Sequence, residues 1–484
     1  MKKRRIACCL ALALLGSAML PAGCTPQDHN GNMYHVLYGE EQTMFPGSEE
    51  QTVLPSGEET GENSGEKDVR SRFALECGKT IPEPAKDGEG DASEQDAAVQ
   101  NADNIRKFAV ESSAKIFPKV SGNYLYSPAS LYMALQLCGS ITAEDSAEDL
   151  MELLGVKDRE ELRLSGNALI RDLSSDREGA SLKIANSMWI DTVHIPELPE
   201  NGKTVLSDSA KALGADIYHV PLMESSTQDL IGSWISERTN HMIEGMPVEP
   251  DANTGMILLN TLYFDKKWRR EILADEIEQG MFYLPAECAP ESDPGSLYPV
   301  YISRIRYDMT NHPYVRTENA TASAVYYKDS SYVIFIKPDS DEVFETVMTE
   351  DLKDVIDAYA TRSYVGRTTS WEVQFGIPKL DYEVKTGPLE YVIKDMGVSS
   401  IFESGSFAEI DPTLYVSRIA QSCRIIMDEN GTKAAAVTEI IEEEKAGPEE
   451  EPEVVDMILD HEYAYVIMSS DGIPLFIGAV RDPR

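Results

Sequence analysis

The chemistry in which this sequence could take part is concentrated near its C-terminus, in residues 434–459. Lys445 is the one basic side chain there, among many glutamates. Proteases of the trypsin type hold a cationic side chain against a carboxylate in their specificity pocket, so such an enzyme could attack the bond between Lys445 and Ala446. Pro448 and Pro452 follow closely and oppose regular structure, which predicts an exposed loop around this bond.

The residues just before this loop have small side chains at every second position, namely Thr432, Ala434, Ala436 and Thr438. Alternate side chains of a β-strand point to the same face. This segment could therefore enter a sheet while presenting only small groups to the core. The whole stretch has the pattern of an exposed loop that a protease could cut. It is preceded by a segment that could join a sheet as an additional strand.

The sequence contains no motif that supports catalysis. It lacks a G-x-S-x-G nucleophile elbow, an H-E-x-x-H pair and a phosphate-binding glycine loop. The seven histidines are scattered, and no Cys-x-x-Cys or Cys/His cluster has the spacing of metal ligands. We therefore expect a protein that is not an enzyme and that needs neither a metal nor a cofactor.

Length and charge limit the possible partners. The 484 residues, of which 42% are hydrophobic, suffice for a large core. The formal net charge of −40 argues against nucleic acid or an anionic membrane surface and favours cationic partners.

The N-terminus reads as a targeting segment, residues 1–24. Four basic residues precede an apolar run from Ile6 to Leu20, which is too short to span a bilayer as a stable helix. Ala22-Gly23-Cys24 resembles the end of a bacterial lipoprotein signal, which implies lipidation at Cys24 and a lipid anchor in the membrane. Cleavage and secretion without a lipid is the alternative. Either outcome predicts an extracellular protein.

Residues 25–97 are predicted to be an acidic, disordered tether, because they are rich in Gly, Pro, Ser and Glu and have few apolar residues. Residues 98–484 form the globular domain. Cys77 lies in the tether, whereas Cys138, Cys288 and Cys423 lie in the domain. Unpaired thiols are the favoured interpretation, with a disulfide left as the alternative.

Periodicity in the domain predicts helices first and strands later, without β-α-β alternation, and so indicates the α+β class. The predicted helices lie near residues 105–116, after Ser127-Pro128, and at 147–154, 234–242 and 388–396. The predicted strands include residues 181–190, 256–264, 371–378, 414–426, 457–468 and 475–480, with further strands between 281 and 338 interrupted by a loop at 286–296.

Four motifs in this order resemble those of the serpin family. They are N-Y-L-Y-S-P-A-S at 123–130, N-T-L-Y-F-D-K-K-W at 260–268, E-N-G-T-K-A-A-A at 429–436 and L-F-I-G-A-V-R-D-P at 475–483. The resemblance implies a serpin fold, with N-terminal helices packed on a large, mostly antiparallel central sheet, further sheets and an exposed reactive loop. It also implies a monomer that inhibits serine endopeptidases as a suicide substrate, in a covalent acyl complex with its target protease.

The resemblance also assigns roles to residues of the loop. The hinge consists of Glu429, Gly431, Thr432, Ala434, Ala435 and Ala436. Counting from Glu429, the position at which inhibitory serpins usually place the scissile bond is Lys445, so the reactive bond is Lys445-Ala446. Counting back from His461 leads instead to the neighbourhood of Glu451. The first count is preferred, because the length on the hinge side sets how far an acylated protease is carried.

A polar cluster beneath the central sheet is the second site that the resemblance implies. It contains Ser127, Ser130, Asn186, Asn260 and Gln421, and it lies where serpins part the sheet to admit the loop. Many family members have a histidine at the position of Gln421. An amide can donate and accept hydrogen bonds but cannot become charged, so the stability of the closed sheet is expected to differ.

Two other interpretations remain open. A non-inhibitory serpin that acts as a surface binding module would be expected to have bulky or charged residues at the inward hinge positions, and only Glu442 fits that description. An inhibitor of a glutamate-preferring or cysteine protease is the other, since glutamates flank Lys445. The sequence does not identify the target protease.

Overall fold

The computed structural model describes residues 36–38, 92–143, 147–177, 180–245, 247–285, 288, 298–365, 371–432 and 453–484. All of them belong to one unit of the chain, His35–Arg484. Cys24, Cys77, the hinge alanines 434–436, and Lys445 and Ala446 of the predicted reactive bond lie outside the described residues.

The first helices of the domain begin and end where capping residues allow. Helix α2 starts after Ser127, whose Oγ accepts a hydrogen bond from the Ser130 amide. Asp158 caps the following helix α4 in the same way, and Gly155 ends α3 in the left-handed conformation. The helices are α1 (Ala92–Ile116), α2 (Pro128–Ile141), α3 (Glu148–Leu154), α4 (Arg159–Leu173), α5 (Glu200–Ala212), α6 (Ser225–Arg238), α7 (Phe344–Thr346), α8 (Leu352–Thr361) and α9 (Glu390–Asp395).

The largest sheet has the strand order β1-β5-β4-β6-β15-β14-β13, with β3 paired to β4. Most of its pairings are antiparallel, whereas β4 with β5 and β6 with β14 are parallel. Its strands are β1 (Val36–Tyr38), β3 (Ser175–Arg177), β4 (Ala180–Asp191), β5 (Asp216–Val220), β6 (Met256–Lys267), β13 (Leu380–Thr386), β14 (Arg418–Asp428) and β15 (Gly431–Thr432).

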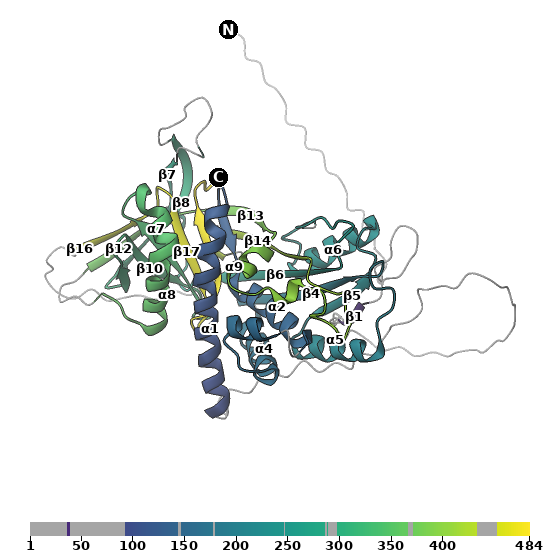
Figure 1. Cartoon of the computed structure of the whole chain (residues 1–484). Coiled ribbons are helices and arrows are strands. Elements are labelled where there is room, and N and C mark those ends of the chain that lie inside the picture. Colours follow the sequence, from purple (N-terminus) through teal and green to yellow (C-terminus); the bar gives the residue numbers. More distant parts are fainter. Residues whose placement is uncertain are drawn as a thin grey trace, which may run out of the picture. The chain divides into compact units, whose positions relative to one another are not determined.

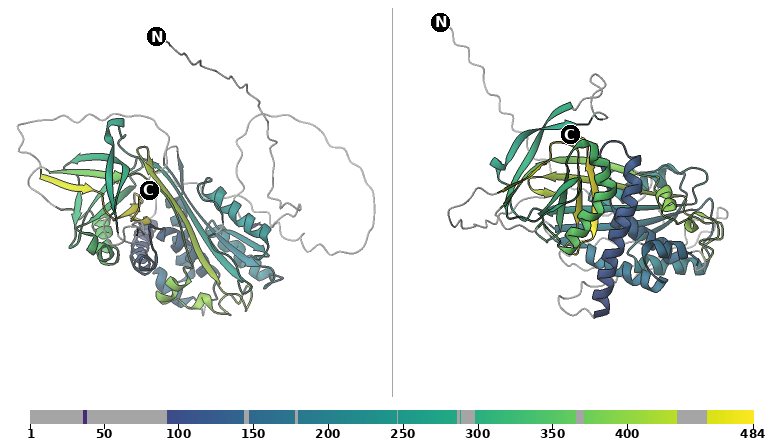
Figure 2. Two further views of the ribbon diagram at one scale, coloured as in Figure 1. Left: turned by 90° about the horizontal axis from the view of Figure 1, so that it is seen from above. Right: turned by 60° about the vertical axis from the view of Figure 1, so that its left-hand side comes forward.

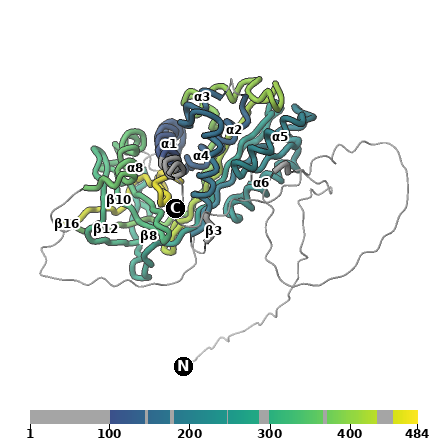
Figure 3. Tube along the Cα trace, turned by 90° about the horizontal axis from the view of Figure 1, so that it is seen from below, coloured from purple at the N-terminus to yellow at the C-terminus, as the bar shows by residue number. Residues whose placement is uncertain are grey.

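Helices cover both faces of this sheet (Figures 1 and 2). From α2, the Ser130 hydroxyl reaches Asn260 on one face of β6. On the other face, Trp234 of α6 packs edge-on against Trp189 of β4. Figure 3 shows α2, α4 and α5 side by side, and the buried apolar side chains between these helices and the sheet form part of the main core.

Two smaller sheets complete the domain. A six-stranded sheet has the order β2-β18-β17-β11-β10-β9, and a four-stranded sheet has the order β16-β12-β8-β7. Their strands are β2 (Tyr124–Tyr126), β7 (Ile277–Leu284), β8 (Tyr298–Thr310), β9 (Tyr314–Arg316), β10 (Ala320–Tyr326), β11 (Tyr332–Pro338), β12 (Trp371–Pro378), β16 (Glu453–Ile458), β17 (Tyr463–Met468) and β18 (Pro474–Val480). The expected α+β class is confirmed.

Several predicted boundaries are corrected. Helix α1 begins at Ala92, six residues before the domain start predicted at residue 98, and the strand Val36–Tyr38, which lies within the predicted tether, pairs with β5. Val36 and Tyr38 are of residue types that favour β structure. The helix predicted at 234–242 ends at Arg238, since Asn240 and His241 adopt positive φ. The strand predicted at 457–468 is two strands, β16 and β17.

Cys138 and Cys423 are buried free thiols, as favoured from the sequence. Among the described residues, no helix has the length and apolar character needed to span a membrane. Within the same part of the chain, no group of three His, Cys, Asp or Glu side chains is arranged to hold a metal ion.

Candidate functional site

The predicted hinge begins inside the large sheet. After β14 the chain turns at Glu429 and Asn430, and β15 then runs antiparallel to both of its neighbours. Thr432 pairs with Lys266 on β6 and with Met427 on β14. The first two residues of the loop-bearing segment thus already lie between β6 and β14. We call the line along which β6 and β14 face each other the seam. The end of the seam that contains β15 is called the hinge end.

Gly431 is required at the hinge end by its surroundings. Its φ of +138° is one that side-chain-bearing residues rarely adopt. A Cβ at this position would lie 2.2 Å from the backbone oxygen of Lys266. The glycine of the hinge motif therefore lets the chain pass against β6.

Thr432 is held by an aromatic pair. Its side chain is buried, and its Oγ1 lies 2.8 Å from the Tyr327 hydroxyl, with which it shares a hydrogen bond. The Tyr327 ring stacks on Trp268, whose indole Nε1 donates to the Asp428 carbonyl at 2.8 Å. Burial raises the pKa of Tyr327, so that its hydroxyl stays protonated and able to donate. These contacts fix where β14 ends and the hinge starts.

Two ion pairs flank the same end of the seam. Lys379 Nζ lies 2.5 Å from a Glu429 carboxylate oxygen, and this hydrogen bond lowers the pKa of Glu429. On the β6 side, the buried Lys266 ammonium pairs with Asp329. Burial lowers the pKa of Lys266, and the Lys266 hydrogen bond helps to lower the pKa of Asp329. The two pairs tie this end of the seam to the junction between β12 and β13 and to the turn between β10 and β11.

Beyond β15 the seam is closed, because β6 and β14 pair directly. Five parallel residue pairs run from Ile257 with Arg418 to Thr261 with Ser422. A strand that continued from Thr432 would have to separate them.

The predicted polar cluster lies beneath this closed part. The Gln421 amide nitrogen donates to Asn260 Oδ1 at 2.5 Å and to the Ser127 carbonyl at 3.0 Å. The Gln421 Oε1 accepts from the Ser127 amide at 2.7 Å and from the Cys423 thiol at 3.2 Å. Ser130 Oγ donates to Asn260 Oδ1 at 3.0 Å. Gln421 is fully buried and links β14, β6 and the start of α2.

Asn186, the remaining member of the predicted cluster, lies beside the hydrogen-bond network of the other four residues. It lies opposite Asn260 in the register of β4 and β6. In the described part of the chain, however, its buried Oδ1 has no hydrogen-bond partner, and neither has Asn260 Nδ2. The structure therefore brings Ser127, Ser130, Asn260 and Gln421 into one network and leaves Asn186 beside it.

Tyr327, Lys379 and Lys266 contact the hinge but were not found by sequence reasoning. Each comes from a strand or turn far along the chain from residues 429–432, so no local spacing connects them. Lys266 lies within the motif at 260–268, which was the one available signal for this side of the hinge.

Comparison with known proteins agrees with these features. The model of the family described as serpin (serine protease inhibitor) matches residues 103–483. Iripin-3 of Ixodes ricinus is 26% identical over 371 residues, which span 74% of this chain and 88% of that protein.

Solved structures show the same fold. AtSerpin1 of Arabidopsis in its native stressed conformation has a TM-score of 0.63 at 20% identity, covering 82% of this chain and all of that one. Human thyroxine-binding globulin, solved in complex with thyroxine, has a TM-score of 0.65 at 19% identity, covering 81% of this chain and all of that one. The predicted fold is confirmed, and the chain belongs to the serpin family.

Proposed function

We propose that this protein inhibits a serine endopeptidase as a suicide substrate. The observation that carries the proposal is the position of Gly431 and Thr432, which already lie between β6 and β14. The residues that follow at inward positions, Ala434 and Ala436, are small. A segment that starts in the seam and continues with small side chains is suited to extend β15 along it.

The mechanism begins with attack of the protease serine on the carbonyl carbon of Lys445. The Lys445-Ala446 bond breaks, the amine of Ala446 leaves with a proton, and Lys445 remains as an acyl ester on the protease. The freed hinge segment then enters the seam and carries the protease with it. Insertion before water reaches the ester gives a trapped complex, whereas earlier hydrolysis releases a cleaved inhibitor and active protease.

The energetics favour insertion once the seam opens. About ten new backbone hydrogen bonds at roughly 1 kcal/mol each give a driving force on the order of 10 kcal/mol. The opposing terms are the five pairs between β6 and β14 and the network around Gln421. Because a better-paired state exists for the same chain, the intact fold is kept by a kinetic barrier.

The preferred target is a trypsin-like protease, since Lys445 is the one basic residue between 434 and 459. Incubation with a panel of serine and cysteine proteases should give complexes that survive denaturant, with the break between Lys445 and Ala446. The Lys445→Ala variant should no longer inhibit trypsin-like enzymes. A break after one of the neighbouring glutamates would identify a glutamate-preferring target instead.

A binding module without inhibitory activity is the second candidate. The fold is compatible with it, because thyroxine-binding globulin was solved with thyroxine bound. The small inward hinge residues favour inhibition. If no protease in the panel yields a stable complex, the binding interpretation replaces the inhibitory one.

We further propose that the mature protein is an extracellular monomer anchored by a lipid on Cys24. The support is the basic start, the apolar run and Ala22-Gly23-Cys24. A Cys24→Ser variant should leave the membrane fraction or fail to be processed. If this variant fractionates with membranes as the mature wild type does, the anchor is not at Cys24.

A further inference from the structure

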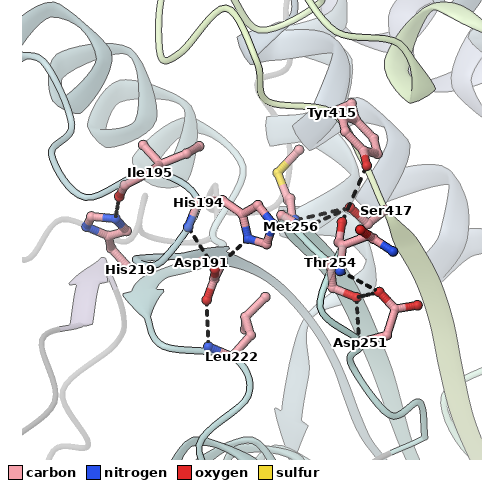
Figure 4. Close-up of polar contacts among 12 residues, drawn as sticks. Asp191, His194, Ile195, His219, Leu222, Asp251, Thr254, Met256, Tyr415 and Ser417 are labelled. Carbon is pink, nitrogen blue, oxygen red and sulfur yellow. Dashed lines mark hydrogen bonds and ion pairs between the residues drawn. The ribbon is translucent and has the colours of Figure 1, made fainter.

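The end of the seam farthest from the hinge is closed by its own set of contacts (Figure 4). Ser417 Oγ accepts a hydrogen bond from the Gly255 amide at 2.9 Å, and the Ser417 amide donates to the Met256 carbonyl at 3.0 Å. The Tyr415 hydroxyl donates to the Asn253 carbonyl at 3.3 Å. These contacts connect the segment before β14 to the segment before β6. We call this region the far end.

Arg418, the first residue of β14, forms an exchangeable ion pair at the far end. Its Nη2 donates to Asp251 Oδ2 at 2.7 Å, and its Nη1 lies 3.8 Å from a Glu390 carboxylate oxygen. The Arg418 side chain is 32% exposed and that of Asp251 is 52% exposed. Such a pair contributes little to stability and can be exchanged for another at low cost.

The observed register indicates which loop residue would reach this end. Thr432 pairs with Lys266 on β6 and Met427 on β14. Both pairings are antiparallel, so each further residue of an inserted strand meets one residue earlier on both neighbours. Counting eleven residues on from Thr432 brings Glu443 opposite Gly255, at the far end.

The alternation of side chains puts Glu443 on the same face as Arg418. Thr432 points to the core, so Glu443, at an odd distance from it, points to the opposite face. By the same count Arg418 is opposite Ile441 and points to that opposite face as well. Glu443 is then the diagonal neighbour of Arg418, roughly 7–8 Å away between Cα atoms and within reach of long side chains.

A cavity lies where the inserted strand would end. Its volume is about 320 Å³, and its lining includes His194, Asn253, Gly255, Leu414 and Tyr415. Continuing the count brings Lys445 opposite Asn253 and Leu414. The register and the cavity therefore lead independently to the same place.

We propose that the far end is a binding site for the acidic end of the protein's own cleaved loop, with Arg418 exchanging Asp251 for Glu443 and the cavity taking residues 444–445. This inference rests on the proposed insertion mechanism and adds to it a named receptor. Insertion brings Glu442, Glu443 and Glu444 toward Asp251 and Glu390, which would repel them. Arg418 is the cation that the register places beside Glu443, so it offsets the charge of the one glutamate of this run that faces away from the core.

The test is a double-mutant cycle on the cleaved chain. Wild type, Arg418→Gln, Glu443→Gln and the double variant are cut by a protease, and intact mass selects forms cut anywhere after Glu443. Melting temperatures are measured for intact and cleaved forms. Glu443→Gln should lower that of the cleaved wild type by about 1 °C, the size expected of one partly exposed ion pair in a domain of this length. In the cleaved Arg418→Gln variant, adding Glu443→Gln should leave the melting temperature unchanged or raise it.

Two further variants serve as controls. They test whether the coupling is specific to Arg418 and whether Asp251 competes with Glu443 for it. Arg424→Gln is the matched control, because Arg424 lies on the same strand and pairs with Asp381 of β13, away from the seam. It should show no coupling to Glu443. Asp251→Asn removes the competing acid and should stabilise the cleaved form relative to the intact one.

The outcomes separate the two proposals. Coupling of Arg418 to Glu443 in the cleaved form only supports the far-end site. A large rise in melting temperature on cleavage without this coupling overturns the site and leaves the insertion mechanism standing. The same coupling in the intact form also overturns it, since Glu443 would then reach Arg418 without insertion. No rise on cleavage of the wild type refutes insertion itself and with it the site.

Discussion

Thr432→Arg would place a guanidinium at the hinge end of the seam. Thr432 is 2% exposed and lies against the Tyr327 hydroxyl. Burying an unpaired charge there would cost several kcal/mol, so in the intact variant β15 should leave the seam. Leaving gives up the hydrogen bond to Tyr327 and the two pairings of β15, each bond being worth about 1 kcal/mol. The fold should therefore survive with a modest loss of stability.

Insertion is affected much more strongly than folding. After cleavage, the first step of insertion requires position 432 to return to the seam, and a penalty of about 3 kcal/mol slows that step by at least 100-fold. Hydrolysis of the acyl ester should then precede insertion. We expect the variant to be cleaved at the same bond and released, as a substrate.

The assay is the stoichiometry of inhibition, measured by titrating the target protease with each variant. The control is Lys433→Glu. By alternation this side chain would point to the opposite face once the segment is inserted, so the variant should inhibit nearly as well as wild type. Were Thr432→Arg to inhibit with wild-type stoichiometry, strand insertion could not be the mechanism.

Three more variants test the contacts around the seam. Tyr327→Phe removes the hydroxyl that binds Thr432 and should lower the free energy of unfolding of the intact form by about 1 kcal/mol, measured by urea titration. Gln421→Leu leaves several buried polar groups unpaired and should cost about 1–3 kcal/mol by the same measurement, so a neutral result would show that the network does not close the seam. The Lys379 ammonium lowers the pKa of Glu429 below its usual 4.5, so the folded state binds a proton less readily than the unfolded chain. Stability from this pair is therefore present above about pH 4.5 and is lost as pH falls through the lower folded pKa, and Glu429→Gln should flatten that part of the acid limb.

The hinge could be predicted from the sequence because its information is local. Gly431 is needed for its backbone conformation, and Thr432 begins a series of small alternating residues, both of which are visible within a few positions. Gln421 was assigned through the resemblance, as the residue at a position where many serpins have a histidine. Asn186 shows the limit of the approach, since it lies opposite Asn260 in the sheet but its buried Oδ1 has no hydrogen-bond partner among the described residues.

The partners that hold the hinge could not be predicted, for a physical reason. Tyr327 and Lys379 meet Thr432 and Glu429 only because three sheets bring distant segments together. Helices α4 and α5 were missed as well. The far end was not considered at all, because Arg418 and Asp251 become neighbours only through the parallel pairing of β6 and β14.

The seam is closed at three levels by polar contacts that can be exchanged singly. Thr432 is held by one hydroxyl at the hinge end, Gln421 links the strands in the middle, and Arg418 binds Asp251 at the far end. Close-packed apolar side chains would offer no such single contacts, because each interdigitates with several neighbours at once. Individual hydrogen bonds and ion pairs worth about 1 kcal/mol each can instead be replaced one after another by those of an entering strand. Under the proposed mechanism, a sheet closed in this way persists for long periods and admits its own loop residue by residue once the loop is cut.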